Sequence, residues 1–120
     1  MVLIRTILII FFTTLILPDE PKNLKVLDIK SRGEIKKYMK SISKDLGVKC
    51  SHCHDIDDKS LDTPEKETAR EMIILTRQIN NYLSSLQKKD DKHEGNQVSI
   101  SCWTCHKGKL EVEQQRPVED

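Results

Sequence analysis

The chain has 120 residues, of which 32% are charged and only 4% aromatic, and its formal net charge at pH 7 is +1. This length accommodates one domain rather than two, and the balanced charge is not the footprint of a nucleic-acid-binding protein. Because aromatic residues are so few, a core built from side chains alone would be thin, and we expect a bound cofactor to complete it.

Residues 1–17 contain one charge, Arg5, followed by an apolar run from Thr6 to Leu17. This pattern is typical of a secretory signal peptide, and the run is shorter than the ~20 residues of a membrane-spanning helix. No small residues mark a cleavage site, so an uncleaved N-terminal anchor is a second interpretation, and a helix buried in the domain is a third. The first two place the protein in the periplasm or on the outer face of the cytoplasmic membrane.

The first predicted helix follows residues 18–30, which read as a linker and a short extended lead-in. Ser31 can serve as its N-cap, and Gly47 favours a left-handed stop at its other end. Its apolar residues recur at spacings of four, three and four, which indicates one buried stripe. That stripe consists of Ile35, Met39, Ile42 and Leu46.

A second helix is predicted from Pro64 to about Gln87, with Thr63 as its N-cap and acidic residues in its first turn. Its periodicity predicts a buried face made up of Ala69, Met72, Ile73, Thr76, Ile79, Leu83 and Leu86. The positions expected to face solvent are Arg70, Glu71, Arg77 and Gln78. Residues 88–97 have the composition of a loop and residues 111–120 that of a polar tail. No segment shows a strong strand pattern, so the predicted fold is mostly α, with little or no sheet.

Two motifs carry the chemistry, and in each of them two cysteines separated by two residues are followed directly by a histidine. They are Cys50-Ser51-His52-Cys53-His54 and Cys102-Trp103-Thr104-Cys105-His106, which together contain all four cysteines of the chain. Two thiols at this spacing can each add to one vinyl group of a haem, while the adjacent histidine places an imidazole nitrogen on the iron. We therefore predict two covalently attached haems, with His54 and His106 as iron ligands.

Other chemistries also use paired cysteines. A structural zinc site, disulfide bonds and a thioredoxin-like redox motif are each compatible with two Cys-x-x-Cys pairs. None of them requires a histidine directly after each second cysteine, so haem accounts for more of the pattern. Within the motifs, His52 is expected to be exposed and Trp103 to pack on the edge of its haem.

The second axial ligand decides whether an iron is closed to small molecules, as in an electron carrier, or open to them. Methionine is a soft ligand that raises the reduction potential, and Met39 and Met72 both lie on helix faces predicted to be buried. Met39, which precedes Cys50 by eleven residues, is predicted to ligate the first iron. Met72 is predicted to ligate the second, with His93 as its competitor. Either methionine could instead be ordinary core filling.

Residues 22–108 resemble the cytochrome c subunit of photosynthetic reaction centres and its small relatives in non-photosynthetic bacteria. Apart from the two motifs, the resemblance is carried by Lys22-Asn23-Leu24, Val26-Leu27, Met39, Leu46-Gly47-Val48-Lys49, Lys66, Ala69-Arg70-Glu71-Met72-Ile73, Ile79-Asn80 and Lys107-Gly108. It implies helices packed parallel to haem planes, with an axial methionine from the helix before each motif. The subunit carries four haems, so this chain, with two motifs, would correspond to about half of it, and a role in photosynthesis is not implied.

These observations predict a di-haem c-type cytochrome domain over residues 31–110 that exchanges electrons with an unidentified protein donor and acceptor. A di-haem peroxidase-like enzyme, with His93 or Glu94 as its distal acid–base group, is the alternative, and a haem-based sensor is a third reading. No nucleic-acid partner is expected, and residues 1–17 could tether the protein to the membrane.

Overall fold

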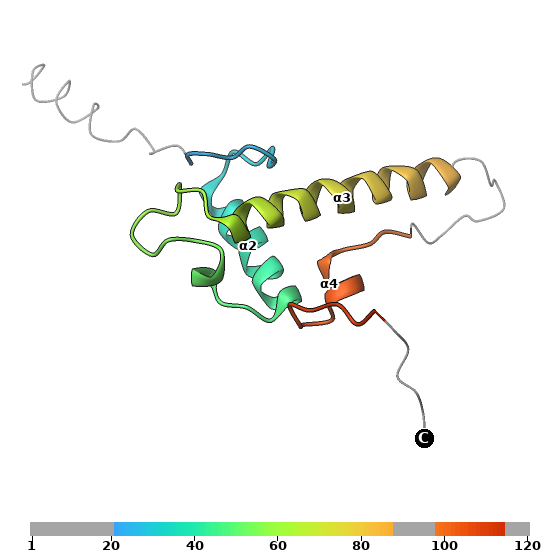
Figure 1. Cartoon of the computed structure of the whole chain (residues 1–120). Helices are drawn as coiled ribbons and strands as arrows, with labels where there is room; N and C mark the ends of the chain where they lie inside the picture. The colour runs from blue at the N-terminus through green and yellow to red at the C-terminus, as the bar shows by residue number, and fades with distance from the viewer. Residues whose placement is uncertain (1–20, 88–97, 115–120) are drawn as a thin grey trace, which may run out of the picture.

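The computed structural model describes residues 21–87 and 98–114 (Figure 1). The segment predicted to direct export, the loop at 88–97 with His93 and Glu94, and residues 115–120 lie outside the described residues. Within the described ranges every regular element is a helix, namely α2 (Arg32–Leu46), the 3-10 turn η1 (Cys50–His52), α3 (Pro64–Gln87) and α4 (Cys102–His106). The mostly α prediction is therefore confirmed for this part of the chain. None of these helices combines the length and apolar character that crossing a membrane requires.

Helix α2 begins and ends where the sequence predicts. Ser31 is the N-cap residue and is extended, but its hydroxyl makes no capping hydrogen bond. At the other end Gly47 adopts a left-handed conformation, with φ 66° and ψ 26°. The amides of Gly47 and Val48 donate to the carbonyls of Lys44 (3.3 Å) and Ser43 (3.0 Å). This pair of bonds satisfies two carbonyls that the end of a helix would otherwise leave free.

The end of α2 packs against α4, and two glycines bring the backbones together. The Gly108 amide donates to the carbonyl of Asp45 at 2.9 Å. A Cβ placed on Gly47 would lie 2.1 Å from the Gly108 carbonyl oxygen, so a larger residue does not fit there without a shift of the backbone. The close approach fixes the second motif against the end of the helix that carries Met39.

Helix α3 starts at the predicted cap. The Thr63 hydroxyl accepts a hydrogen bond from the Lys66 amide (3.2 Å) and donates one to the Cys53 carbonyl (2.7 Å). The first bond satisfies one of the free amides at the start of the helix. The second ties the start of α3 to the first motif.

The buried side of α3 is more polar than the sequence suggests. Ile73 is the only buried apolar side chain among the described residues, at 8% exposure, and on the same side Lys66 and Arg70 are 9% and 7% exposed. The prediction that Arg70 faces solvent is wrong, because ion pairs with Asp62 (2.8 Å) and Glu67 compensate its charge and permit burial.

The predicted apolar face of α3, in contrast, is largely open. Met72, Ile79 and Leu86 are 41%, 37% and 42% exposed, so the prediction that the polypeptide buries Met72 is wrong. Helix α3 makes no extensive contact with another described helix, whereas α2 packs on both α4 and η1. The protein part alone therefore leaves the apolar side of its longest helix uncovered.

Candidate functional site

The first motif forms a single tight turn. Within it, the amides of Cys53 (3.3 Å) and His54 (3.0 Å) both donate to the carbonyl of Cys50, which brings the two thiols and the imidazole into one turn of chain. Cys50 is exposed and Cys53 is half-buried, and this burial, with smaller contributions from the negative charges of Glu65 and Cys50, raises the pKa of the Cys53 thiol. His52 is exposed, as predicted.

His54 is half-buried, and its Nδ1 is inaccessible and has no hydrogen-bond partner within the described residues. Burial lowers the pKa of its imidazole, and the positive charges of Lys66, Lys59 and Arg70 lower it further. The backbone carbonyl of Lys59 acts in the opposite direction and raises the pKa. Each of these effects except the carbonyl favours the neutral ring, which is the form that binds a metal ion. With Nδ1 enclosed, Nε2 is the nitrogen available to an iron.

A hollow of ≈ 310 Å³ lies beside this turn. Its walls combine the reactive groups of the motif with an exposed apolar side chain from the following loop. They are formed by Lys49, Cys50, Ser51, His54, Asp55, Ile56 and Lys59. The hollow thus opens onto both a thiol and the imidazole that the sequence assigns to the first haem.

The second motif coincides with α4. Ser101 and Thr104 form a capping box at its start, in which the Ser101 amide donates to Thr104 Oγ1 at 3.0 Å. Cys105 is exposed and Cys102 is half-buried. Burial, reinforced by the negative charge of Asp45, raises the pKa of the Cys102 thiol. The four cysteines form no disulfide bond.

His106 is oriented by the backbone that follows it. Its Nδ1 lies 3.1 Å from the carbonyl oxygen of Lys109 and 3.0 Å from that of Leu110. Because carbonyl oxygens only accept hydrogen bonds, Nδ1 carries the proton and Nε2 presents its lone pair. A hydrogen bond of this kind is what orients a metal-binding histidine and fixes its tautomer.

Asn80 joins the second motif to α3. Its side-chain amide donates to the carbonyl of Ile100 (2.9 Å) and accepts from the amide of the same residue (2.7 Å). Gln87 adds a hydrogen bond to the Val98 carbonyl at 3.2 Å. Together these bonds hold the lead-in to α4 along the helix that carries Met72. The role of Asn80 was not predicted, although an amide beside Ile79 inside a helix was a signal that could have shown it.

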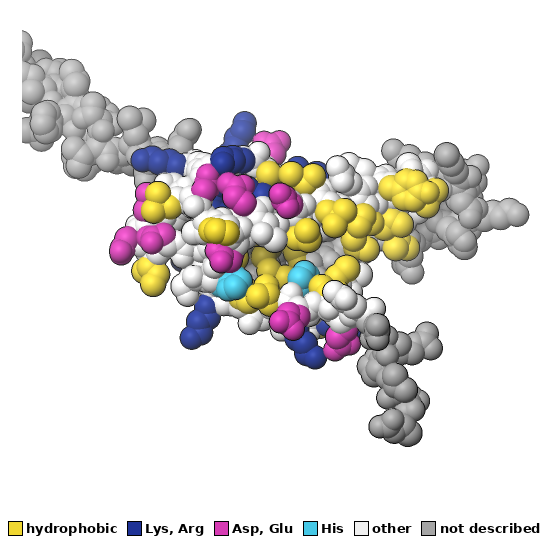
Figure 2. Space-filling model, in the orientation of Figure 1, with side chains coloured by type: hydrophobic (Ala, Val, Ile, Leu, Met, Phe, Trp, Pro, Cys, Tyr) yellow, Lys and Arg dark blue, Asp and Glu magenta, His cyan; other side chains and the backbone are white. Residues whose placement is uncertain are grey.

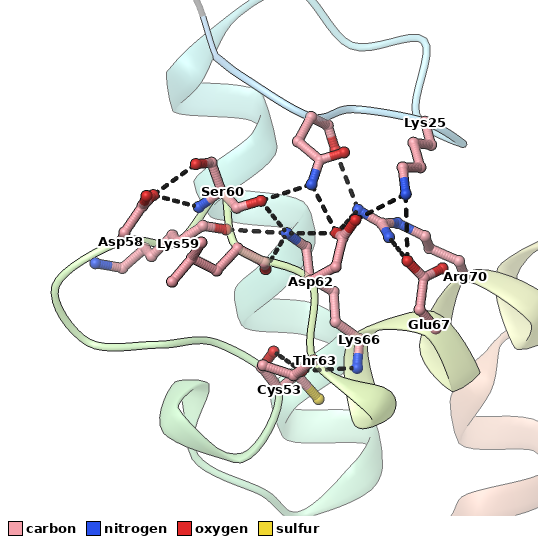
Figure 3. A network of polar contacts seen from close by, with 12 residues as sticks. Lys25, Cys53, Asp58, Lys59, Ser60, Asp62, Thr63, Lys66, Glu67 and Arg70 are labelled. Atoms are coloured by element: carbon pink, nitrogen blue, oxygen red, sulfur yellow. Dashed lines mark hydrogen bonds and ion pairs between the residues drawn. The ribbon is translucent and has the colours of Figure 1, made fainter.

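A polar network connects the segment before α2, the loop after the first motif and the start of α3 (Figure 3). Asp62 is at its centre, and its carboxylate accepts hydrogen bonds from Lys25 Nζ (2.7 Å) and Asn23 Nδ2 (2.6 Å). It also forms an ion pair with Arg70 (2.8 Å). The hydrogen bonds from Lys25 and Arg70 hold the pKa of Asp62 far below its usual range. Asn23 and Lys25 are 39 and 37 residues away from Asp62 in the sequence. The sequence did not predict these long-range contacts.

Lys66, like Arg70, is a buried cation of this network. Its ammonium donates to three successive carbonyls, those of Lys59 (3.1 Å), Ser60 (3.2 Å) and Leu61 (2.8 Å), and lies 3.5 Å from Asp62. All of its donors are thereby satisfied by the loop that follows the first motif. Lys66 fixes the path of that loop.

The two methionines lie on different helices. Met39 is half-buried on α2, and Met72 is 41% exposed on α3. Hydrophobic side chains form a band along α3, and histidine side chains are visible on the same face of the molecule (Figure 2). The exposed members on the Met72 side of the helix are Leu75, Ile79, Tyr82 and Leu86.

Three features of the site fit a flat apolar cofactor that is attached to cysteine and ligated by histidine. They are the open apolar band on α3, the hollow beside the Cys50 thiol, and the two histidines whose Nε2 atoms are available to a metal ion. Trp103 is 51% exposed. This exposure leaves room for the edge of a haem, which the sequence predicts as its packing partner. The pairing of Met39 with His54 and of Met72 with His106 stays a prediction.

Comparison with known proteins gives the relationship directly. Residues 13–118 match the family model described as the photosynthetic reaction centre cytochrome C subunit. Cytochrome c-554 of Chloroflexus aurantiacus is 37% identical over 87 residues, which cover 70% of this chain and 20% of that protein. The photosynthetic reaction center cytochrome c subunit of Rubrivivax gelatinosus is 32% identical over 96 residues, which cover 73% of this chain and 26% of that subunit.

The chain thus spans only about a fifth to a quarter of the length of these relatives. This share is smaller than the half that two motifs in a four-haem subunit suggest. No solved structure matches it. The matched region contains both motifs, α2, α3 and α4. The chain therefore belongs to the photosynthetic reaction centre cytochrome c subunit family.

Proposed function

We propose that this protein is a c-type cytochrome that binds two haems covalently and carries electrons outside the cytoplasmic membrane. The observation that carries the proposal is that each motif is built into one short turn, with the Nδ1 of its histidine enclosed at the first and hydrogen-bonded at the second. Both arrangements leave Nε2 for an iron. The names of the relatives, which are cytochromes, support the same reading.

In this proposal each haem is held by three residues of its motif and one methionine. The first would be attached to Cys50 and Cys53 and ligated by His54 and Met39. The second would be attached to Cys102 and Cys105 and ligated by His106 and Met72. When bound, the haems supply a reversible one-electron couple. Met39 and Met72 would occupy the remaining axial positions, and apolar side chains of α2 and α3 would cover the haems, an arrangement that suits transfer of electrons rather than chemistry on small molecules.

Placement outside the membrane is proposed from the sequence, because haem attachment to Cys-x-x-Cys-His takes place after export and residues 1–17 have the pattern of a signal peptide or anchor. Residues 18–30 would then be the lead-in, residues 31–110 the haem domain, and residues 111–120 a polar tail. The donor and acceptor would be redox proteins that remain to be identified.

The number of haems tests the proposal first. The holoprotein, purified after expression with the c-type haem attachment machinery, should show two haems per chain by mass spectrometry and by the pyridine haemochrome assay. Cys53→Ser and Cys105→Ser should each weaken attachment at a different motif. A value of one haem, or none, in the unaltered chain would contradict the proposal, and the mass of the same sample shows whether residues 1–17 are retained.

The axial ligands are tested by spectroscopy. Met39→Ala and Met72→Ala should each remove part of the weak absorption band at the red end of the visible spectrum that marks a methionine–iron bond. Ile74→Ala, which truncates an exposed residue on a different side of α3 from Met72, should leave that band unchanged. High-spin iron in the resting protein, together with turnover of peroxide, would instead support the peroxidase-like alternative.

A further inference from the structure

Charges of opposite sign are separated along the chain, although the net charge is only +1. Residues 30–49, which contain α2, carry seven basic and two acidic side chains. Residues 55–71, which form the loop after the first motif and the start of α3, carry three basic and seven acidic ones. A separation of this kind gives the surface a positive region and a negative region that act on approaching molecules.

The positive region includes the outer side of α2. The apolar stripe of this helix is half-buried, and its lysines are exposed. Because residues four apart share one side of a helix, Lys36, Lys40 and Lys44 form a row, about 12 Å long. Lys37 lies beside this row and is exposed as well. We call these four residues the lysine face.

The lysine face has no partner inside the chain. None of its four ammonium groups forms an ion pair or a hydrogen bond with another residue in the part of the chain that the structure describes. Asp62, by contrast, pairs with Lys25 and Arg70 inside its own network. The charge of α2 is therefore available to a molecule outside the chain.

The end of α2 brings this charge to both motifs (Figure 1). The hydrogen bond of 2.9 Å from the Gly108 amide to the Asp45 carbonyl places Lys107, the residue after the second motif, beside the last turn of the helix. Lys49 directly precedes the first motif, and both lysines are exposed. Asp45, the acidic residue of this turn, is half-buried. Cations from three segments thus gather where the two cysteine-containing turns meet.

The chemistry of the lysine face favours a protein over a lipid surface. A helix that lies in a membrane interface inserts an apolar side next to its cations, but the large exposed apolar side chains among the described residues all lie outside α2. Redox proteins often meet in transient complexes that bury little area. Complementary charge steers such encounters and raises their rate.

We infer, on the basis of the proposed function, that the lysine face, extended by Lys49 and Lys107, is the docking surface for an acidic one-electron redox protein. Carboxylates of the partner pair with the ammonium groups and hold it against the helix that carries Met39, beside both motifs. One electron then passes between the partner and a haem iron. When the iron is reduced the partner is oxidised, and no proton or bond is transferred.

Flavodoxin hydroquinone, an acidic one-electron donor, is the probe. When it is mixed with the ferric holoprotein in a stopped-flow experiment, it becomes the semiquinone as one haem iron is reduced. The rate should fall steeply with added salt, because the screening length shortens from about 30 Å at 0.01 M to about 3 Å at 1 M. Reduction by hexaammineruthenium(II), a small cation, should not fall with salt.

Variants locate the surface. Lys36→Gln combined with Lys40→Gln removes two charges and retains good helix formers. Each charge changes the rate roughly twofold at low salt, so reduction by flavodoxin should slow about fourfold, while reduction by hexaammineruthenium(II) should not slow. Lys36→Arg combined with Lys40→Arg retains the charge and should retain the rate. Lys22→Gln, which removes a charge from an exposed residue before α2, should leave the rate unchanged.

The inference is overturned if flavodoxin reduces the glutamine double variant as fast as the unaltered protein, or if Lys22→Gln slows the reaction as much. An unchanged flavodoxin rate also overturns it when the same double variant loses binding to phosphatidylglycerol vesicles or loses self-association in sedimentation, because a membrane or a second copy is then the occupant. Hexaammineruthenium(II) tests the proposed function separately. A holoprotein that accepts no electron from it fails as a carrier, whereas one that accepts electrons from it and is insensitive to the charge of α2 lacks only this docking surface.

Discussion

Replacement of Gly47 by alanine tests the contact that joins α2 to the second motif. Gly47 has a φ of 66°, a conformation that costs an L-residue with a Cβ about 1–2 kcal/mol. Its Cβ would also lie 2.1 Å from the carbonyl oxygen of Gly108. Since that separation cannot persist, the two turns must move apart, and the hydrogen bond from the Gly108 amide to Asp45, worth about 1 kcal/mol, would be lost.

The expected loss in free energy of unfolding is therefore about 2–3 kcal/mol, a large part of the about 5–15 kcal/mol of an ordinary domain. Denaturant unfolding of the holoprotein, followed by circular dichroism and by the haem absorption, measures it. Gly33→Ala is the control, because its Cβ would meet no heavy atom closer than Ser31 Oγ at 3.6 Å. Alanine within a helix should stabilise the chain by about 0.5–1 kcal/mol.

A second substitution separates backbone strain from the clash. Asparagine tolerates the left-handed conformation better than alanine does, but it brings the same Cβ toward Gly108. Gly47→Asn should therefore remain destabilised. The reasoning would be refuted if Gly47→Asn or Gly47→Ala were as stable as the unaltered protein, or if Gly33→Ala were destabilised as much.

Two further predictions concern the connections that hold the motifs. Asn80→Ala removes both hydrogen bonds to Ile100 and should lower the free energy of unfolding by about 1–3 kcal/mol. It should also weaken the absorption band of one methionine–iron bond. Asn81→Ala, on the exposed side of the same helix, should have neither effect. The ion pairs of Asp62 depress its pKa in the folded chain, so they contribute stability that is present above the ordinary carboxyl pKa of about 3.9 and is lost as the pH falls toward the depressed folded value. Asp62→Asn should flatten this acid-side fall in an unfolding titration, and a curve like that of the exposed control Asp28→Asn would contradict the assignment.

The helices were predictable because their boundaries are encoded locally. Thr63 followed by Pro64 gives the start of α3, and Gly47 gives the end of α2, since capping and left-handed stops depend on neighbouring residues in the chain. The two motifs are equally local, because the thiols and the histidine must share one turn. None of these features requires knowledge of the tertiary structure.

The errors concern interactions between distant parts of the chain. Periodicity assigns a charged residue such as Arg70 to solvent, but partners in the loop before the helix permit its burial. The same periodicity identified the apolar face that contains Met72 without indicating what covers it. A cofactor that is not encoded as residues leaves a helix face open in the polypeptide, and amphipathicity alone cannot distinguish that case from packing against another helix.

The scarcity of buried apolar side chains has a consequence for how the protein is made. With Ile73 as the only such residue among those described, the polypeptide has little to gain from collapsing before its cofactors arrive. On the proposed function, maturation would start from an exported, loosely ordered chain whose Cys50 and Cys105 are accessible to the attachment enzymes. Each ligation would then add core material and order the helix that contacts it. A chain that missed one haem would remain open to periplasmic proteases, so quality control would follow from the shape of the molecule itself.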